Sequence, residues 1–544
     1  MRKFRVMIVG GGTAGWMTAA YLRKALDNNL EISLVESPSI NTIGVGEATF
    51  STLQLFFQFL ELKEEEWMPQ CHASYKLAIK FVDWNKERRH FYHPFQRYET
   101  IKGRSLAEWW LKLKRHDERF DYACFTVPSI CDARRSPRYM DGRVFDYKID
   151  HYLNVTSNEK ALILEDLKIQ YPYAYHFDAA LLAKFMCGYA KERGVTQILD
   201  DVVQVNLTAN GSIGSVTTKN NGELTADLFI DCTGFRGLLI NKTLDEPFIS
   251  FSDSLLCDSA VAMQLPSNGE QEGINPYTTA TALTSGWVWN IPLFQRIGTG
   301  YVYCSAFKSA EDAERELRAH LGDRSKNRKA SHIKMRIGRS RNSWVKNCVA
   351  IGLSSGFVEP LESTGIFFIQ HGIEELVNYF PSTERDEQAI KSYNKAVANC
   401  IDGVREFLTL HYVASTRDDT PFWQATKRDI NVPADLAERL KLWKHRLPTK
   451  KTINPNYHGF EAYSYSVMLL GLGFRPETSL PILDFMDNSG AETAFNELRK
   501  RKEHLTCTLP SLYQYLALRY EQTEPQAHTT WYKEEQPYSP PVSA

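Results

Sequence analysis

Short apolar runs that end in glycines occur at the start of the chain and return much later. An apolar run at residues 6–9 precedes a glycine-rich turn, a helical segment at 16–26 and a second apolar run at 31–36. A strand, a helix and another strand in this order predict a βαβ unit and therefore a parallel sheet. Apolar runs within 224–237 and 347–357 predict two later strands of the same sheet.

Strands this far apart in the sequence require large insertions between them. Segments 202–217 and 283–304 are typical of β-structure, and 311–321 is typical of a helix. From about Asp386, apolar residues recur at three- and four-residue spacing, which predicts helices, and the stretch 436–443 has the same spacing.

The pattern as a whole predicts an α/β fold with a helical C-terminal part. We expect residues 1–385 to form the sheet-containing module with its β-rich insertions, and residues 386–521 to form a mostly helical part that caps it. Residues 522–544 are rich in Pro, Glu and Gln and predict a flexible tail.

Composition narrows the class of protein. A length of 544 residues exceeds what one simple core fills, so more than one lobe is expected. With 43% apolar and 24% charged residues and a net charge of −1, the chain predicts a soluble enzyme without a nucleic-acid or membrane partner. The ten cysteines lack C-x-x-C and zinc-ligand spacing, which favours reduced thiols, no metal site and a cytoplasmic location. The longest apolar runs are too short for a membrane span, and glycines end the first one too early for a signal peptide.

The turn after the first strand, "VGGGTAGW", is a dinucleotide-binding fingerprint. Gly10, Gly12 and Gly15 satisfy G-x-G-x-x-G where a strand passes into a helix, and Glu36 ends the second strand about twenty residues later. Glycines let the backbone approach a pyrophosphate closely, the helix N-terminus favours its charge, and the acid accepts a ribose hydroxyl. NAD and FAD are both bound in this way. The later "DLFIDCTGFRG" resembles the second dinucleotide-contacting strand of FAD-dependent monooxygenases, and the small-residue loop at 43–49 could lie against a flavin.

Two further motifs point to one family. Trp287, Trp289, Ile291 and Pro292 spell W-x-W-x-I-P, and "GFVEPLESTG" at 356–365 matches F-x-x-P-x-x-S-x-G. Together with "GGGTAGWMTAAYL", "GVGEATFSTL", "SYKLAIKF", "HFYHPF", "FIDCTGFRGLLIN" and "EPLESTGIFFIQH", they run in order across most of the chain. The sequence resembles the flavin-dependent tryptophan halogenases, above all the subgroup that acts at C6 or C5 of the indole.

The resemblance implies a Rossmann-like FAD-binding module of the flavin monooxygenase type and a two-component reaction. Reduced FAD from a separate NAD(P)H-dependent flavin reductase reacts with O2 to a flavin hydroperoxide, and chloride or bromide turns this into hypohalous acid. The acid must reach L-tryptophan without meeting another nucleophile, so flavin and substrate lie on two sides of a packed wall. Residues two apart on a strand share a face, which suits the two indoles of W-x-W-x-I-P to such a wall. Packing of both rings in an ordinary core is the alternative.

Two ionisable residues carry the chemistry in this resemblance. Lys76 matches the lysine that hydrogen-bonds hypohalous acid or forms a haloamine with it. If its segment is one strand, Lys80 shares its face, so spacing alone does not separate the two lysines. Glu362 matches the carboxylate that stabilises the cationic ring and removes its proton. We interpret Glu359, three residues earlier, as structural.

The resemblance also implies an anion site and a set of cofactor contacts. Halide would bind the backbone at Thr364 and Gly365, where a helix begins near Ile366. The cofactor contacts it implies are Gly10, Gly12, Thr13, Ala14, Gly15, Glu36, Gly46, Ala48, Val202, Leu353 and Ile366.

Substrate contacts follow from three segments. His93 and Phe95 match an H-x-F pair whose rings sandwich the indole, and Phe50 would add a third wall. The amino-acid end of the substrate would meet a second set of residues. In it, Asn456 precedes the tyrosine where near relatives have two consecutive tyrosines. The members of that set are Gln170, Tyr173, Tyr457 and Glu461.

Several alternatives stay open at this point. We predict halogenation at C6, followed by C5 and then C7, and another indole or a peptide tryptophan remains an alternative substrate. A flavin hydroxylase and an inactive flavin-binding protein are further alternatives, which the paired tryptophans and the lysine disfavour. A homodimer is compatible with the sequence.

Overall fold

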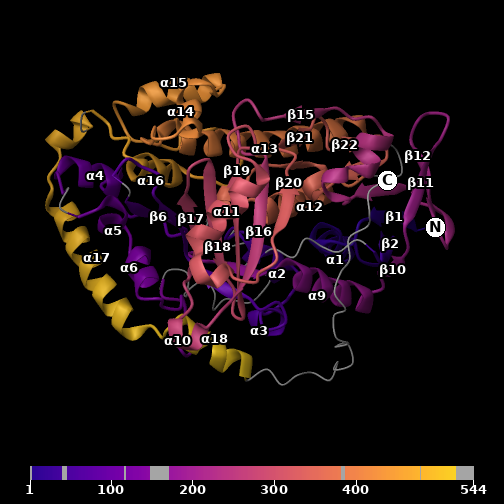
Figure 1. Cartoon of the computed structure of the whole chain (residues 1–544), viewed down its shortest axis with the longest axis horizontal. Coiled ribbons are helices and arrows are strands. Elements are labelled where there is room, and N and C mark those ends of the chain that lie inside the picture. The colour runs from indigo at the N-terminus through magenta and orange to yellow at the C-terminus, as the bar shows by residue number, and fades with distance from the viewer. Residues whose placement is uncertain are drawn as a thin grey trace.

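The computed structural model describes residues 3–39, 46–87, 89–115, 118–146, 171–381, 386–477 and 480–521. Figure 1 shows the first strands near the N-terminus at one end of the molecule and helices α4, α5 and α17 at the other. Two large sheets and one long helix connect these ends and position the residues of interest.

The predicted parallel sheet is present and has six strands. The apolar runs at 224–237 and 347–357 supply two of them, as predicted, and only the last strand is antiparallel to its neighbour. In order across the sheet, the strands are β10 (Thr196–Leu199), β2 (Leu30–Glu36), β1 (Phe4–Val9), β14 (Leu228–Asp231), β23 (Cys348–Ala350) and β22 (Trp344–Val345).

Both faces of this sheet are covered at its centre, which explains why β1 and β14 are mostly apolar. Ile8 points into the core that contains α1 (Thr13–Leu26), and Met7, one residue earlier, points into a second core. That second core includes Val216 of a small antiparallel sheet, β11 (Val202–Leu207), β12 (Ile213–Thr218) and β13 (Gly222–Thr225). The β-structure predicted for 202–217 is therefore confirmed.

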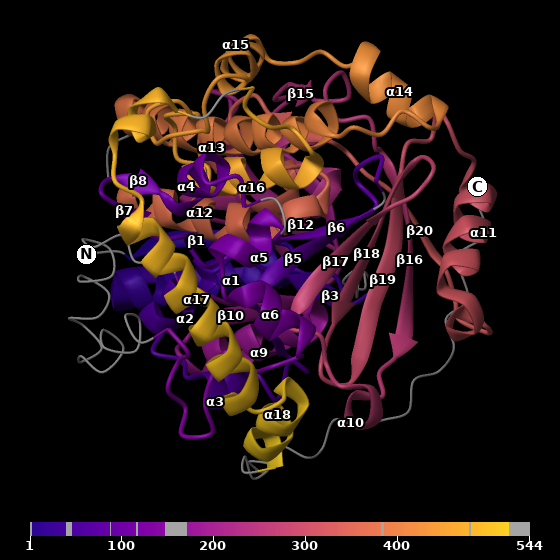
Figure 2. The same cartoon turned by 90° about the vertical axis from the view of Figure 1, so that its left-hand side faces the viewer.

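A second large sheet has seven strands and is mostly antiparallel. Its inner face points into the main core, and α11 (Ala310–Leu321), the helix predicted at 311–321, covers its outer face (Figure 2). In order, the strands are β20 (Ser331–Lys334), β16 (Ser259–Pro266), β19 (Arg296–Tyr303), β18 (Gly286–Pro292), β17 (Tyr277–Ala282), β5 (Ala78–Val82) and β6 (His90–Pro94).

Smaller elements fill the space around the two sheets. The remaining sheets are β3–β9–β4 (Gly46–Ala48, Ala174–Asp178, Ser74–Lys76), β15–β21–β24 (Phe248–Ser250, Gly338–Ser340, Gly356–Phe357) and β7–β8 (Thr100–Ile101, Arg104–Ser105). The helices in this part of the chain are α2 (Leu53–Phe59), α3 (Glu64–Trp67), α4 (Leu106–Lys112), α5 (Phe120–Cys124), α6 (Val127–Asp132), α9 (Ala179–Glu192), α10 (Gly269–Glu272) and α12 (Gly365–Asn378).

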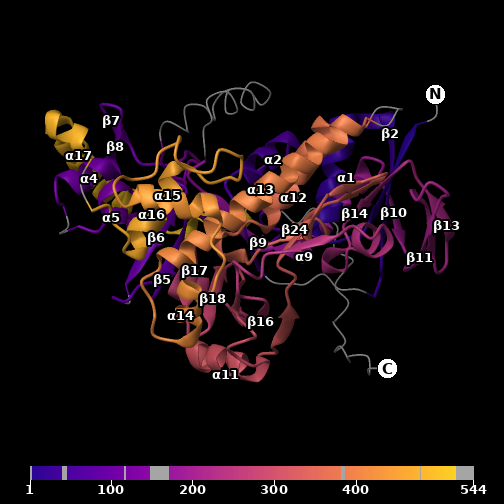
Figure 3. The ribbon, with the colours of Figure 1, turned by 90° about the horizontal axis from the view of Figure 1, so that it is seen from above.

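Within residues 386–521 the described elements are helices, as the apolar spacing predicts. The longest is α13 (Glu387–Ala414), which crosses the molecule in Figure 3. Its first half binds the backbone of Trp344 in the six-stranded sheet through Asn394, and His411 in its last turn packs against Phe81 of β5 in the second sheet. The others are α14 (Pro421–Arg428), α15 (Ala434–Trp443), α16 (Ala462–Leu472), α17 (Ser489–Thr508) and α18 (Leu512–Glu521). The tail predicted at 522–544 lies outside the described residues.

Two global features bear on the expectations from composition. All ten cysteines are free thiols. Among the residues that the structure describes, no helix is both long and apolar enough to cross a membrane.

Candidate active site

Lys76 is the last residue of β4 and its side chain is fully buried. Its ammonium nitrogen donates to the hydroxyl of Ser363 at 2.8 Å and to the carbonyl of Thr49 at 3.1 Å, and it lies 5.1 Å from the ring centre of Phe95. Burial lowers the pKa of Lys76 to about 7, although the nearby Glu362 carboxylate opposes this shift. The residue is therefore a mixture of ammonium and amine at neutral pH.

The structure separates the two lysines that spacing alone left equivalent. The chain changes sheets at Leu77, whose backbone N–H binds the carbonyl of Pro276, so Lys76 and Lys80 lie on different strands. Lys80 points at Tyr92 and Tyr277 and pairs with Asp132.

Glu362 reaches the same place from a tight turn between two helical segments. It ends a short 3-10 helix, and Ser363 then adopts a left-handed backbone conformation (φ 63°) before α12 begins at Gly365, one residue from the predicted start. This turn directs Ser363 to Lys76 and leaves the Glu362 carboxylate next to it, 2% exposed.

Two imidazoles hold the Glu362 carboxylate. The Nδ1 atom of His93 lies 3.0 Å from both carboxylate oxygens, and the Nε2 atom of His411 lies 2.8 Å from Oε1. Burial alone would raise the pKa of Glu362, but His93 and His411 outweigh it and lower the pKa to about 2. Glu362 is therefore an ionised carboxylate at neutral pH despite its burial.

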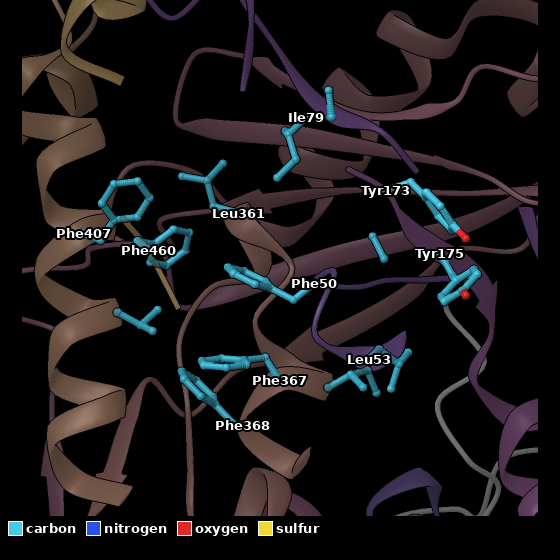
Figure 4. Close-up of a cluster of buried hydrophobic side chains, with 14 of the residues drawn as sticks. Phe50, Leu53, Ile79, Tyr173, Tyr175, Leu361, Phe367, Phe368, Phe407 and Phe460 are labelled. Carbon is cyan, nitrogen blue, oxygen red and sulfur yellow. The ribbon is translucent and has the colours of Figure 1, made fainter. Parts of the chain in front are cut away.

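A narrow aromatic recess opens beside Glu362. His93 and Phe95 both line it, as the H-x-F pattern predicts, and Phe50 stacks on Phe367 and meets Phe460 edge-on, each with ring centres 5.1 Å apart (Figure 4). The residues that line the recess are Phe50, Ile79, His93, Pro94, Phe95, Glu362, Gly459, Phe460, Tyr463 and Ser464. Flat apolar walls with one carboxylate suit an aromatic ring on which positive charge develops.

The residues predicted to hold the amino-acid end of the substrate are scattered. Tyr173 does not line the recess: its hydroxyl is fully buried between Glu64 and Arg138, and Figure 4 shows it apart from Phe460. Tyr457 is 58% exposed and lies beside Phe367, and Glu461 pairs with Arg97. Both are close in sequence to the recess-lining Gly459 and Phe460, but neither lines the recess. Gln170 lies outside the described residues.

The W-x-W-x-I-P motif forms most of β18 and presents its two indoles on one face, toward the main core. The rings meet edge-on with centres 6.4 Å apart, whereas Val288 between them points to α11. The Trp287 N–H donates to Glu359 at 2.9 Å, and the carbonyl of Pro292 accepts from Ser74, two residues before Lys76. The motif is therefore hydrogen-bonded to Glu359, in the turn that carries Glu362, and to β4, the strand that carries Lys76.

Residues 46–50 run from the loop that was predicted to lie against a flavin to the recess. Gly46 of β3 packs so closely on β18 that a β-carbon there would lie 2.8 Å from Leu293 and 3.4 Å from Ile291. Ala48 follows in the same strand, the next carbonyl accepts from the Lys76 ammonium, and Phe50 reaches the recess. The predicted cofactor side and the substrate side are thus only a few residues apart.

The fingerprint loop has the shape that a dinucleotide needs. Gly10 has φ 113°, and a β-carbon there would lie 2.3 Å from the carbonyl of Cys232, whereas a β-carbon on Gly12 would meet no atom within 4 Å. No side chain caps α1 at Gly12, so no cap competes with a bound anion for the N–H groups of its first turn. Glu36 lies against this loop and accepts from Gln197 and Trp16. These residues fit a bound FAD.

The other predicted cofactor residues are spread over several elements, and Val202 packs against the second core, on the face of the six-stranded sheet away from α1. Ala14 is in the first turn of α1 and contacts Gly352, which precedes Leu353 in a turn after β23. Thr13 bonds the carbonyl of Ala179, Val202 begins β11 close after β10, and Ile366 is buried at the start of α12.

The predicted halide site is at the N-terminus of α12. No side chain caps this helix at Thr364, and a β-carbon on Gly365 would meet no atom within 4 Å. Open space over unbonded helix N–H groups is compatible with a small anion.

Two polar residues of the site were not predicted from the sequence: Ser363 binds Lys76, and His411 binds Glu362. Glu359, which we interpreted as structural, accepts from both Trp287 and Tyr412. Ser363 was noticed only as a letter of a motif. His411 occupies a core position of an apolar helix pattern, where a histidine alone does not stand out.

Comparison with known proteins agrees with this geometry. The model of the tryptophan halogenase family matches residues 5–488. The chain belongs to the tryptophan halogenase family. The tryptophan 6-halogenase SttH of Streptomyces toxytricini is 52% identical over 94% of this chain and 98% of SttH. KtzR of Kutzneria sp. (strain 744), a 7-chloro-L-tryptophan 6-halogenase, is 51% identical over 94% of this chain and 99% of KtzR.

The structural comparison confirms the fold. The crystal structure of SttH matches this tryptophan halogenase with a TM-score of 0.90 at 51% identity, and it covers 95% of this chain and 100% of SttH. The α/β fold with a Rossmann-like module, predicted from the sequence, is thus that of the flavin-dependent halogenases.

Proposed function

We propose that this protein halogenates C6 of the indole ring of free L-tryptophan. The observation that carries the proposal is the position of buried Lys76 beside the recess that Glu362 lines: the lysine binds Ser363, the residue after Glu362, and lies over the recess-lining ring of Phe95. The choice of C6 is supported by SttH and KtzR, which are more than half identical to this chain and are both 6-halogenases.

The residues of the fingerprint loop and Glu36 would hold FAD, and Thr364 with Gly365 would hold chloride or bromide. When bound, reduced FAD supplies the electrophilic halogen, as hypohalous acid, from O2 and the halide. The sequence has one dinucleotide fingerprint, at 10–15, so we propose that a separate NAD(P)H-dependent reductase delivers the reduced flavin.

Lys76 would receive the halogen at the junction of the two sides. As an ammonium it would donate a hydrogen bond to hypohalous acid and make the halogen more electrophilic. As an amine it would bond to the halogen and form a haloamine, while its N–H proton and the hydroxide of the acid leave as water. Its two hydrogen bonds to Ser363 and Thr49 fix the nitrogen for either role. The indoles of Trp287 and Trp289 keep the substrate ring away from the cofactor side.

Glu362 would complete the substitution. Attack of the ring on the halogen leaves a cationic ring with both halogen and hydrogen on one carbon. The carboxylate stabilises this charge, the C–H bond breaks, its electron pair returns to the ring, and the proton passes to Glu362.

The test is an incubation of the protein with FAD, a flavin reductase, NADH, O2, chloride and L-tryptophan, with 7-chloro-L-tryptophan as a parallel substrate. Mass spectrometry should show chlorine in place of hydrogen, and the coupling pattern of the ring protons should identify C6. A C5 or C7 product would refute the position, and an inserted oxygen would show a hydroxylase instead.

Matched variants test the residues. We expect Lys76→Met to abolish halogenation, and Glu362→Gln to slow it on the order of 10²-fold or more. Lys80→Met is the control, because Lys80 faces Asp132 and lies on another strand. Wild-type rates in either of the first two variants would exclude the role assigned to that residue.

A further inference from the structure

The hydrogen bonds of His411 determine where its protons are. Its Nδ1 atom lies 2.8 Å from the carbonyl oxygen of Phe407, which can only accept, so Nδ1 carries a hydrogen. Its Nε2 atom lies 2.8 Å from Oε1 of Glu362. A neutral imidazole has one N–H, which Phe407 already uses, and a carboxylate is also only an acceptor. One additional proton must therefore lie between Nε2 and Oε1.

His458 shows that this requirement is specific to His411. It has the same pattern, with Nδ1 2.7 Å from the carbonyl of Asn456 and Nε2 2.8 Å from the hydroxyl of Tyr465. A hydroxyl can donate to Nε2, so neutral His458 satisfies both contacts. The two histidines are both buried and differ in the group that faces Nε2.

We propose that His411 is a positioning residue that carries a proton on both ring nitrogens, binds Oε1 of Glu362 and leaves Oε2 to take the proton of the substrate. This inference rests on the proposed role of Glu362 as base. His93 approaches both oxygens at 3.0 Å, and within the described part of the chain Oε2 has no partner other than His93. Glu362 lines the recess, and we assign Oε2 to the substrate ring because His411 holds Oε1.

The charges around Glu362 favour the proton on the histidine. Lys76 faces the carboxylate from β4, His93 from β6 and His411 from α13. The charged groups on β4 and β6 favour the ionised carboxylate, so the proton between Glu362 and His411 is assigned to Nε2. The resting pair is then an imidazolium and a carboxylate.

The proton balance of the step is simple. The C–H bond of the halogenated ring carbon breaks, its electrons restore the aromatic ring, and the proton binds Oε2. The pair ends as a neutral carboxylic acid beside the same imidazolium, and Glu362 returns its proton to water before the next turnover. His411 gains and loses no proton, so its contribution is the orientation and charge of the carboxylate.

Nitrogen-15 NMR of histidine-labelled protein tests the protonation state without turnover. The chain has 14 histidines, and the signals that disappear in His411→Gln identify His411. At neutral pH we expect both ring nitrogens of His411 to carry protons, and one of them to lose its proton in Glu362→Gln, whose amide can donate to Nε2. An unprotonated nitrogen on His411 in the wild-type protein would overturn the proposal.

Kinetics with ring-deuterated L-tryptophan test the consequence. In His411→Gln the amide keeps a hydrogen bond to Oε1 but loses the charge, so we expect turnover to fall roughly 10-fold or more and removal of the ring proton to limit it. Turnover of ring-deuterated L-tryptophan by His411→Gln should then be slower than turnover of ordinary L-tryptophan. The control His458→Gln should not show this isotope effect. Slower turnover with the isotope effect of the wild type would show a merely structural role and refute the inference.

Failure of the proposed function is distinguishable from failure of this inference. If the wild-type protein does not halogenate tryptophan, or if Glu362→Gln is as fast as wild type, the function or the base is wrong. The protonation state of His411 read by NMR stands apart from both results.

Discussion

Trp287 donates its indole N–H to Oε2 of Glu359 at 2.9 Å, and Tyr412 donates its hydroxyl to the same oxygen. Glu359 has no exposed surface, and burial raises its pKa to about 7, although both hydrogen bonds oppose the shift. Glu359 lies three residues before Glu362. One short turn therefore carries two carboxyl groups with different contacts: Glu359 binds a tryptophan of the barrier motif, and Glu362 lines the recess.

This contact predicts different effects for two similar substitutions. Trp287→Phe and Trp289→Phe remove the same atoms from neighbouring positions of one sheet face, but only Trp287 donates to a buried carboxyl group. We expect Trp287→Phe to lower the free energy of unfolding by about 1 kcal/mol more than Trp289→Phe, the usual range for a lost hydrogen bond to a buried group. Urea unfolding measures the difference, and equal losses would show that the hydrogen bond contributes nothing net.

Lys76 predicts a pH dependence of stability. Burial lowers its pKa from 10.5 to about 7, so between these pH values the unfolded chain binds more protons than the folded protein. Stability then rises with pH in this window, with a slope approaching about 1.4 kcal/mol per pH unit, and the gain is absent below pH 7.

Lys76→Met removes this titration. We expect the variant to be more stable than wild type at pH 7 and its advantage to shrink steadily toward pH 10, measured by urea unfolding at each pH. Lys441→Met, at an exposed position of α15, is the control and should follow the wild-type pH profile. A constant difference between Lys76→Met and wild type would mean that the lysine titrates normally in the folded protein.

The sequence predicted the scaffold well because periodicity and glycine-ended strands are local signals. The apolar runs at 224–237 and 347–357 could be assigned to the first sheet, and β14 and β23 are there. The start of α12 was placed within one residue by the family resemblance and not by periodicity.

The contacts of the site could not be predicted in this way, because they depend on how distant segments meet. A strand break at Leu77 separates Lys76 from Lys80, and nothing in the alternation of the segment reveals it. His411 looks like one more buried position of α13 until the turn at Glu362 is placed beside it. Tyr173 has an aromatic ring and a hydroxyl, as a substrate contact would, but its hydroxyl is hydrogen-bonded to Glu64 and Arg138.

Substitutions of Ser363 distinguish its hydrogen bond to Lys76 from the backbone strain of the turn. Its hydroxyl accepts from the lysine at 2.8 Å, and its backbone has φ 63°, a left-handed conformation that costs a residue with a side chain about 1 kcal/mol or more relative to glycine. Ser363→Ala keeps the strain and Ser363→Gly relieves it, whereas both lose the hydroxyl. We expect turnover to fall about 10-fold or more in both, because the reacting nitrogen loses its orientation. The Ser363→Gly variant should melt at a higher temperature than the Ser363→Ala variant. If turnover is also higher in Ser363→Gly, backbone strain and not the hydrogen bond to Lys76 determines the rate.

The glycines of the fingerprint loop predict a separation of folding from cofactor binding. Gly10 has φ 113°, and a β-carbon there would lie 2.3 Å from the carbonyl of Cys232, so Gly10→Ala should destabilise the protein by more than about 1 kcal/mol. Gly12 has an ordinary φ of −74° and open space around it, so Gly12→Ala should melt like wild type.

The same open space is where a pyrophosphate would approach the first turn of α1, so Gly12→Ala should weaken FAD binding while the fold stays intact. Gly188→Ala on α9 is the matched control, since a β-carbon there also meets no atom within 4 Å but lies on another helix. Calorimetric titration with FAD and thermal melting measure the two effects on the same samples. If Gly12→Ala and Gly188→Ala bind FAD equally well, the cofactor does not use the N-terminus of α1, because only one of the two methyl groups would stand in its way.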